Sequence, residues 1–177
     1  TPEPTATPIT PTPGEGYDLP YYLYVEKGSF TLTIYQRDDN GGYTKIYAQY
    51  RVAHGGNKTP NGVFELTDRR ERWREFPKGG CTQFAVAYQG NLFTHSPMYG
   101  SFDNHNMWPK YYDGEKGIGT DSTGGCIRMV TEAARFIYEN CAPGTKLEIV
   151  LGSPRGTTSP EPPDRNGLRQ DPTDIEA

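Results

Sequence analysis

Apolar and polar residues alternate with a period of two over much of the first half of the chain, which predicts β-strands. The alternation is clearest at residues 29–36, where Phe30, Leu32 and Ile34 alternate with more polar neighbours. The same pattern predicts further strands at residues 21–26, 43–53, 62–67, 84–89 and 92–95. Asn40-Gly41 and Gly90-Asn91 are typical of the turns that join strands into hairpins. This half of the chain is therefore β-rich.

One stretch has a helical period instead. Apolar residues recur at helical spacing from Ala133 to Cys141, and Pro143-Gly144 ends the pattern. We expect Thr131 to cap this helix and residues 145–150 to form a closing strand. The chain thus predicts a mainly β domain with one main helix.

The two ends of the chain lack either pattern. Residues 1–18 are rich in Thr and Pro, a composition that keeps a chain extended. Residues 153–177 combine several prolines with polar and charged residues and offer little apolar surface to offset the entropy of ordering. We therefore expect a linker at 1–18, one domain at 19–152, and a Pro-rich tail without packed structure at 153–177.

Charge argues against a nucleic-acid partner, because the net charge is −4. The basic run at residues 69–75 is interleaved with glutamate, and we interpret it as a solvated face or loop. No segment is apolar and long enough to cross a membrane. The chain begins without Met in a Thr/Pro stretch, so we expect that an N-terminal signal or anchor has been removed. We expect a monomer.

The three cysteines, Cys81, Cys126 and Cys141, are too few for a disulfide framework, although a Cys81–Cys141 bridge stays open. Neither Cys-x-x-Cys nor His-x-x-x-His occurs, so we expect no zinc site and no cofactor. Cys81 and Cys141 are interpreted as packed apolar residues.

Cys126 has a different context, in Ser122-Thr123-Gly124-Gly125-Cys126-Ile127-Arg128. Glycines leave backbone amides uncrowded, so a reacting carbonyl oxygen can approach them. Arg128 adds positive charge that favours the reactive thiolate. His95 ends an apolar run and can supply the base that a cysteine nucleophile needs. A lone cysteine is usually a small buried apolar residue, but this context favours a nucleophile.

These segments resemble the catalytic domain of YkuD-type L,D-transpeptidases, over roughly residues 20–151. Thr123, Gly125, Cys126 and Arg128 match the family's cysteine block, and His95 matches its upstream histidine. Residues 57–64 match its Thr-Pro-x-Gly-x-Phe segment. The resemblance implies a mixed, sandwich-like β fold and an extracytoplasmic enzyme associated with the bacterial cell wall.

The resemblance also implies the chemistry. Cys126 would be acylated by a peptidoglycan stem peptide with release of D-Ala, and an amine on a neighbouring stem would then form a cross-link. His95 would be the base, with its second nitrogen held by a backbone carbonyl of Ser122, Thr123 or Gly124. Amides around Gly125 and Cys126 would form the oxyanion hole. Arg128 would bind a substrate carboxylate or form a structural ion pair.

Two features depart from the family pattern. Gly124 stands where the family has a second histidine. The span between His95 and Ser122 is long and rich in aromatic residues, which favours a lid or a groove wall, with a packed surface loop as the alternative. Candidate substrate contacts in or beside this span are Ser96, Tyr99, His105 and Trp108.

Three alternatives remain. Attack by water in place of an amine would make the protein an L,D-carboxypeptidase. A noncatalytic wall-binding module would account for the Thr/Pro linker and the aromatic span, but it has no need of both Cys126 and His95. A papain-like hydrolase fits worse, because there the cysteine precedes the histidine in the chain.

Overall fold

The computed structural model describes residues 18–152 and 159–175. The strands are β1 (Tyr21–Glu26), β2 (Thr31–Gln36), β3 (Lys45–Arg51), β4 (Gly62–Glu65), β5 (Arg70–Glu75), β6 (Cys81–Gln89), β7 (Leu92–His95), β8 (Met98–Tyr99), β9 (Ile127–Arg128) and β10 (Lys146–Val150). One α-helix, α1 (Thr131–Asn140), and two short 3-10 helices, η1 (Gly56–Lys58) and η2 (Pro109–Tyr111), complete the described elements.

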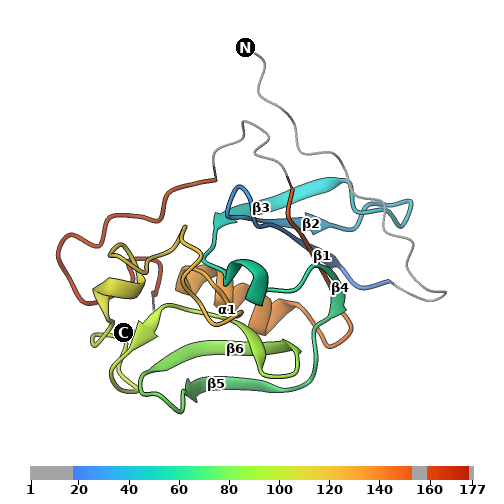
Figure 1. Ribbon diagram of the computed structural model, residues 1–177. Coiled ribbons are helices and arrows are strands. Elements are labelled where there is room, and N and C mark those ends of the chain that lie inside the picture. Colours follow the sequence, from blue (N-terminus) through green and yellow to red (C-terminus); the bar gives the residue numbers. More distant parts are fainter. Residues whose placement is uncertain (1–17, 153–158, 176–177) are drawn as a thin grey trace.

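The strands form two mixed sheets, as Figure 1 shows. The first has the order β3-β2-β1-β10-β4, with β1 parallel to β10 and antiparallel to β2. The second has the order β5-β6-β7-β9, with β8 paired to β6 and with β7 parallel to β9. The mainly β, sandwich-like fold with one main helix is confirmed.

The main core lies between the two sheets. Leu23 and Val25 of β1, Val86 of β6 and Ile137 of α1 belong to one buried cluster. Figure 1 shows α1 between the sheet that contains β1 to β3 and the strands β5 and β6. Because one face of the second sheet packs on this core, side chains that alternate along its strands point either into the core or away from it.

Strand β5 corrects the interpretation of residues 69–75 as a solvated face or loop. Residues 70–75 pair with β6 as an edge strand. The guanidinium of Arg72 lies 4.0 Å from the centre of the Phe84 ring, and that of Arg74 lies 4.1 Å from the centre of the Phe93 ring. These long side chains cover apolar rings while they keep their charge, so the strand needs few apolar residues of its own.

The start of α1 also differs from expectation. Val130, and not Thr131, is the N-cap residue, and its side chain makes no capping bond. The caps come from far along the chain: Asp171 Oδ2 accepts from the Thr131 amide at 2.7 Å, and Thr173 Oγ1 accepts from the Glu132 amide at 3.0 Å. A carboxylate at a helix N-terminus also interacts favourably with the helix dipole.

Residues 159–175, called here the C-terminal segment, were expected to lack packed structure, but they pack against the domain. Arg51 Nε donates to Ser159 Oγ at 3.0 Å, and Tyr112 Oη donates to the Pro163 carbonyl at 2.6 Å. Asp171 is fully buried. Polar contacts to buried partners hold the segment, so its low apolar content did not reveal it. Residues 1–17, 153–158 and 176–177 of the expected linker and tail lie outside the described residues.

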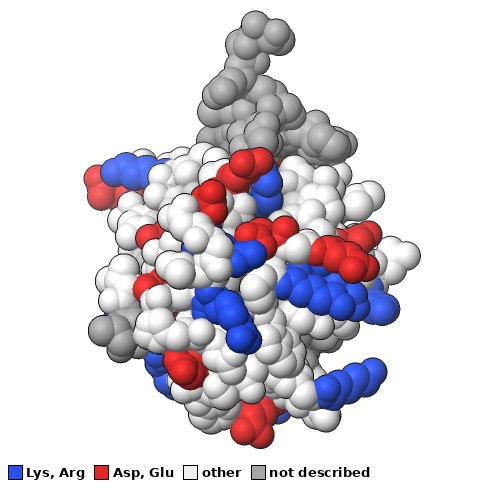
Figure 2. Space-filling model, turned by 90° about the vertical axis from the view of Figure 1, so that its left-hand side faces the viewer, with Lys and Arg blue, Asp and Glu red and all other residues white. Residues whose placement is uncertain are grey.

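The surface mixes both signs of charge. Figure 2, which shows the left side of Figure 1, has Lys and Arg interspersed with Asp and Glu. Cys81, Cys126 and Cys141 are all free thiols. Within the described part of the chain, no helix is long and apolar enough to cross a membrane. That part also contains no group of three or more His, Cys, Asp or Glu side chains placed to hold a metal ion.

Candidate active site

The parallel pairing of β7 with β9 brings His95 and Cys126 to one face of the second sheet. Thr94 pairs with Ile127 and His95 pairs with Arg128. Because side chains alternate, His95 and Cys126 both point away from the core, to which Ile127 belongs. Strand spacing and rise put their Cα atoms roughly 8 Å apart. The two residues therefore meet across neighbouring strands, 31 positions apart in sequence.

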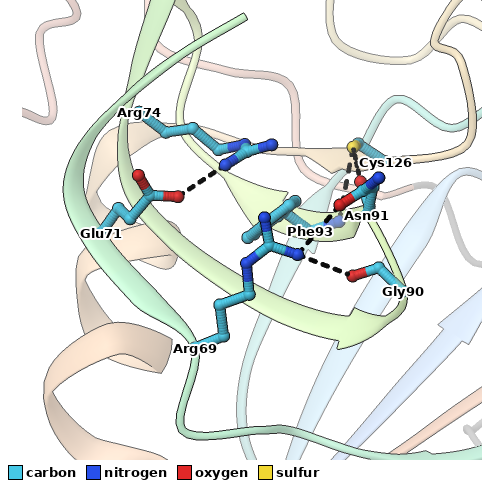
Figure 3. Close-up of polar contacts among 7 residues, drawn as sticks. All are labelled: Arg69, Glu71, Arg74, Gly90, Asn91, Phe93 and Cys126. Atoms are coloured by element: carbon cyan, nitrogen blue, oxygen red, sulfur yellow. Dashed lines mark hydrogen bonds and ion pairs between the residues drawn. The ribbon is translucent and has the colours of Figure 1, made fainter.

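The thiol of Cys126 lies against the start of β7. Its Sγ accepts from the Phe93 amide at 3.4 Å and lies 3.9 Å from the Asn91 carbonyl oxygen. Figure 3 shows this contact together with Arg69 and Arg74, whose side chains approach the Phe93 ring. The nucleophile candidate thus has an apolar ring and two guanidinium groups as neighbours.

The ring of His95 is fixed in one orientation. Its Nδ1 lies 2.6 Å from the Ser96 carbonyl oxygen and 3.0 Å from Thr82 Oγ1. A carbonyl oxygen only accepts, so Nδ1 carries the proton and Nε2 keeps its lone pair. The edge of the Phe76 ring packs against the imidazole, with ring centres 5.5 Å apart. The backbone carbonyl expected from Ser122, Thr123 or Gly124 is therefore that of Ser96.

Burial keeps both reacting groups neutral at pH 7. It lowers the pKa of His95 to about 3, and the charges of Arg128 and Arg74 act in the same direction. Burial also raises the pKa of the Cys126 thiol, against opposing effects of the Phe93 amide, Arg74 and Arg128. The expected influence of Arg128 on the thiol has the predicted sign, but desolvation outweighs it.

Hydrogen bonds from three sides hold the backbone before Cys126. Thr123 Oγ1 donates to the Cys126 carbonyl at 2.7 Å and accepts from the Gly125 amide at 3.1 Å. The Gly125 carbonyl accepts from Thr59 Oγ1 and from Tyr88 Oη, both at 2.9 Å. Gly125 has a φ of 127°, and a Cβ there would lie 2.7 Å from the Lys58 carbonyl oxygen. Only glycine fits this position without displacement.

Two backbone amides of this segment remain available to a ligand. The Gly125 amide is used by Thr123, but those of Gly124 and Cys126 make no hydrogen bond with any described residue. A Cβ on Gly124 would meet no atom within 4 Å, so the backbone there faces open space. Ser122 Oγ is bonded locally, 2.6 Å from Thr120 Oγ1. The Gly124 and Cys126 amides are thus the oxyanion-hole candidates.

His54, which the sequence did not mark as a site residue, is buried beneath the cysteine segment. Its Nε2 lies 2.8 Å from the Lys27 carbonyl oxygen, its Nδ1 accepts from the Gly56 amide at 2.9 Å, and its carbonyl accepts from the Thr123 amide. A Cβ on neighbouring Gly55 would lie 2.7 Å from the Gly125 nitrogen. The turn at residues 54–56 therefore supports the segment that carries Cys126.

Arg128 is buried and bonded to backbone. Its Nη1 donates to the Lys116 carbonyl at 2.6 Å, and the Tyr111 carbonyl lies 3.5 Å away. Its guanidinium stacks 5.1 Å from the centre of the Tyr111 ring. Burial lowers its pKa to about 10, which leaves it charged at neutral pH. Arg128 therefore holds the preceding segment through the Tyr111 and Lys116 carbonyls, and it makes no ion pair with a described residue. Its Nε is buried and has no hydrogen-bond partner among the described residues. With 4% of its surface exposed, Arg128 offers a substrate carboxylate little access.

Residues 99–117, called here the aromatic segment, run between β8 and the turn before Cys126. Of the expected substrate contacts, Ser96 and Tyr99 are fully buried, whereas Trp108 is half-buried and His105 is exposed. Tyr99 Oη lies 3.3 Å from Thr131 Oγ1 in the core. Phe102 is 54% exposed and stacks on Trp73. The aromatic segment is therefore buried at Tyr99, Met107 and Tyr112 and exposed around residues 101–105 and 113–115.

Sequence reasoning missed several residues that shape the site. Thr59 lies in the quoted Thr-Pro-x-Gly-x-Phe match, which was a usable signal for its contact with Gly125. Tyr88 lies in the strand predicted at residues 84–89, and Thr82 lies just before that strand. Nothing in the sequence around either residue indicates a contact with the site. Arg74 was overlooked because its run was interpreted as a solvated face.

Comparison with protein families finds one match. The family model of YkuD, the L,D-transpeptidase catalytic domain, matches residues 20–149. No significant match was found among curated protein sequences.

Solved structures share the fold at low sequence identity. An L,D-transpeptidase from Stackebrandtia nassauensis has 15% identity and a TM-score of 0.56, over 85% of this chain and 61% of that one. An L,D-transpeptidase from Mycobacterium smegmatis has 16% identity and a TM-score of 0.55, over 74% and 58%. The L,D-transpeptidase LdtMt1, solved in complex with imipenem, has 17% identity and a TM-score of 0.54, over 74% and 59%. The chain thus spans about three fifths of the length of these structures.

Proposed function

The chain belongs to the YkuD family of L,D-transpeptidase catalytic domains, and we propose that it forms cross-links between peptidoglycan stem peptides through an acyl-enzyme on Cys126. The observation that supports this most is the meeting of Cys126 and His95 on one sheet face, with the His95 Nδ1 proton given to the Ser96 carbonyl. Such an arrangement leaves Nε2 as the only ring nitrogen able to accept a proton.

In the first half-reaction, Cys126 attacks the donor carbonyl. Rotation about χ1 turns Sγ from the Asn91 carbonyl toward His95, and Nε2 takes the thiol proton as the S–C bond forms. Because both groups start neutral, the thiolate forms during attack and not beforehand. The Gly124 and Cys126 amides donate to the oxyanion. The C–N bond then breaks, His95 protonates the departing amine, D-Ala leaves, and a thioester remains.

In the second half-reaction, an amine of a neighbouring stem attacks the thioester. His95 Nε2 takes a proton from that amine as the new C–N bond forms, the C–S bond breaks, and the proton returns to Sγ. The partner is thus peptidoglycan, which supports a place of action outside the cytoplasm, at the cell wall.

The experiment is intact-mass analysis of the protein after exposure to a muropeptide donor, with and without an acceptor stem. The expected result is an acyl adduct on Cys126 that an acceptor amine converts into a cross-linked product. Release of a shortened peptide alone would make the protein an L,D-carboxypeptidase. No adduct and no product, with retained muropeptide binding, would indicate a wall-binding module.

A further inference from the structure

A cluster of arginines lies on the same face as Cys126, and the mechanism above gives it no role. The guanidinium groups of Arg69 and Arg74 lie 5.0 and 4.1 Å from the centre of the Phe93 ring. The amide of Phe93 donates to the Cys126 thiol. Figure 3 shows both guanidiniums and the thiol around this one residue. Two cations therefore lie about a side-chain length from the nucleophile.

An ion pair holds Arg74 in place but occupies only one nitrogen of its guanidinium group. Its Nη1 donates to Glu71 Oε2 at 2.6 Å, and its side chain is only 15% exposed. Nη2 has no hydrogen-bond partner among the described residues, and Nε has none either but is itself buried. Arg69 donates to Asn91 Oδ1 at 2.9 Å, an uncharged partner. Arg74 is thus paired with one carboxylate and Arg69 with none among the described residues, which leaves positive charge beside the thiol.

Arg128, the other arginine whose charge acts on the thiol, is less accessible than Arg74. Arg128 is buried and donates to the Lys116 carbonyl. Of the two, Arg74 lowers the pKa of Cys126 more than Arg128 does. A guanidinium N–H that donates to a carboxylate forms a charge-assisted hydrogen bond, and such bonds are strong when partly desolvated.

We propose that Arg74, assisted by Arg69, is the carboxylate-binding group of this site, and that it binds the terminal carboxylate of the D-amino acid that leaves. This rests on the function proposed above. The carbon of that carboxylate is two bonds from the scissile nitrogen, about 2.5 Å, so it stays near Sγ when the thiol attacks. Arg74 then orients the donor and discriminates against donors whose terminus is neutral.

The first test compares a stem tetrapeptide that ends in D-Ala with the same peptide as its C-terminal carboxamide. Wild type should prefer the acid in kcat/KM, and Arg74→Gln should reduce that preference about tenfold, the ratio expected from one charge-assisted hydrogen bond. Arg135→Gln is the matched control, because Arg135 also pairs with a glutamate, Glu139, but on α1. An unchanged preference in Arg74→Gln would overturn the assignment of the carboxylate.

The second test does not depend on transpeptidation. Iodoacetate and iodoacetamide alkylate a thiol with loss of iodide, and they differ in one carboxylate. The rate ratio of iodoacetate to iodoacetamide at Cys126 should fall about threefold or more in Arg74→Gln and stay unchanged in Arg135→Gln. An unchanged ratio in Arg74→Gln would refute a carboxylate site beside the thiol. Should no donor react in any variant, the proposed function fails while this ratio still decides the role of Arg74.

Discussion

The strand pair β7–β9 and the aromatic segment meet at Arg128 but are held by different kinds of contact. The strand pair is fixed by backbone pairing, which brings His95 beside the segment that carries Cys126. The aromatic segment is fixed by side chains from elsewhere: Arg128 binds the Lys116 carbonyl, and Tyr112 binds the Pro163 carbonyl. The comparison teaches that backbone pairing brings the reacting groups together, whereas the aromatic segment beside them depends on side chains from elsewhere in the chain.

The largest effect should come from the strand pair itself. Cys126→Ala should abolish turnover, a loss of about 10⁴-fold or more, because no other group can form the thioester. It should also abolish the acyl adduct that forms with a muropeptide donor, read by intact mass and peptide mapping. Cys81→Ala is the control and should keep the adduct, because Cys81 is buried and burial raises its thiol pKa. An adduct that persists in Cys126→Ala would exclude this nucleophile.

Replacement of the base should cause the second-largest loss of activity. His95→Gln should reduce kcat by about 10³-fold, since base and nucleophile act together. The fold should persist, as circular dichroism would show. His105→Gln carries the same substitution at an exposed histidine and should retain activity. If the two variants behaved the other way round, His105 would be the base.

Arg128 tests the boundary between the two regions. Arg128→Gln removes the hydrogen bond from the buried guanidinium to the Lys116 carbonyl. The aromatic segment should therefore become sensitive to limited proteolysis near residues 111–116, and kcat/KM should fall about tenfold to a hundredfold. Arg165→Gln, which removes the exposed ion pair with Asp113 in the same segment, should change little. If Arg128→Gln resisted proteolysis and kept full activity, the aromatic segment would not depend on Arg128.

The stability of the strand pair should depend on pH. The pKa of His95 is about 3 in the folded state and about 6.5 when unfolded. The unfolded chain therefore binds the extra proton, and stability that is complete above pH 6.5 falls by up to about 1.4 kcal/mol per pH unit as pH drops toward 4. Denaturant unfolding at several pH values should show a smaller acid loss in His95→Gln than in wild type. Parallel curves would mean that His95 titrates normally.

The smallest effect belongs to the C-terminal segment. Asp171→Ala removes the carboxylate that caps the Thr131 amide and should lower the free energy of unfolding by about 1–2 kcal/mol. Turnover at saturating donor should remain close to wild type. Asp164→Ala, in the same segment but exposed, is the control. Equal stability of Asp171→Ala and wild type would show that the segment contributes nothing to the helix.

This contrast also explains what the sequence revealed. Period-two alternation located β1 and β7 to the residue, and the cysteine block located the nucleophile, because these signals are local. Strand β5 was missed because its arginines cover rings on β6 and β7, a tertiary contact without a local pattern. The Ser96 carbonyl was missed because any residue can supply a backbone oxygen. The Asp171 cap was missed because its partner lies 40 positions away.

That separation has a consequence for the order of folding. In a chain made from its N-terminus, the strands of both sheets and all of α1 emerge before residue 171. Until Asp171 and Thr173 arrive, the first amides of α1 lack these partners. Contacts between residues so far apart in sequence form late, because the entropy of closing the loop is lost before the contacts stabilise the chain. The last step of folding therefore buries the Asp171 carboxylate, and a ribosome-bound chain that stops short of residue 171 displays the start of α1 to chaperones and proteases.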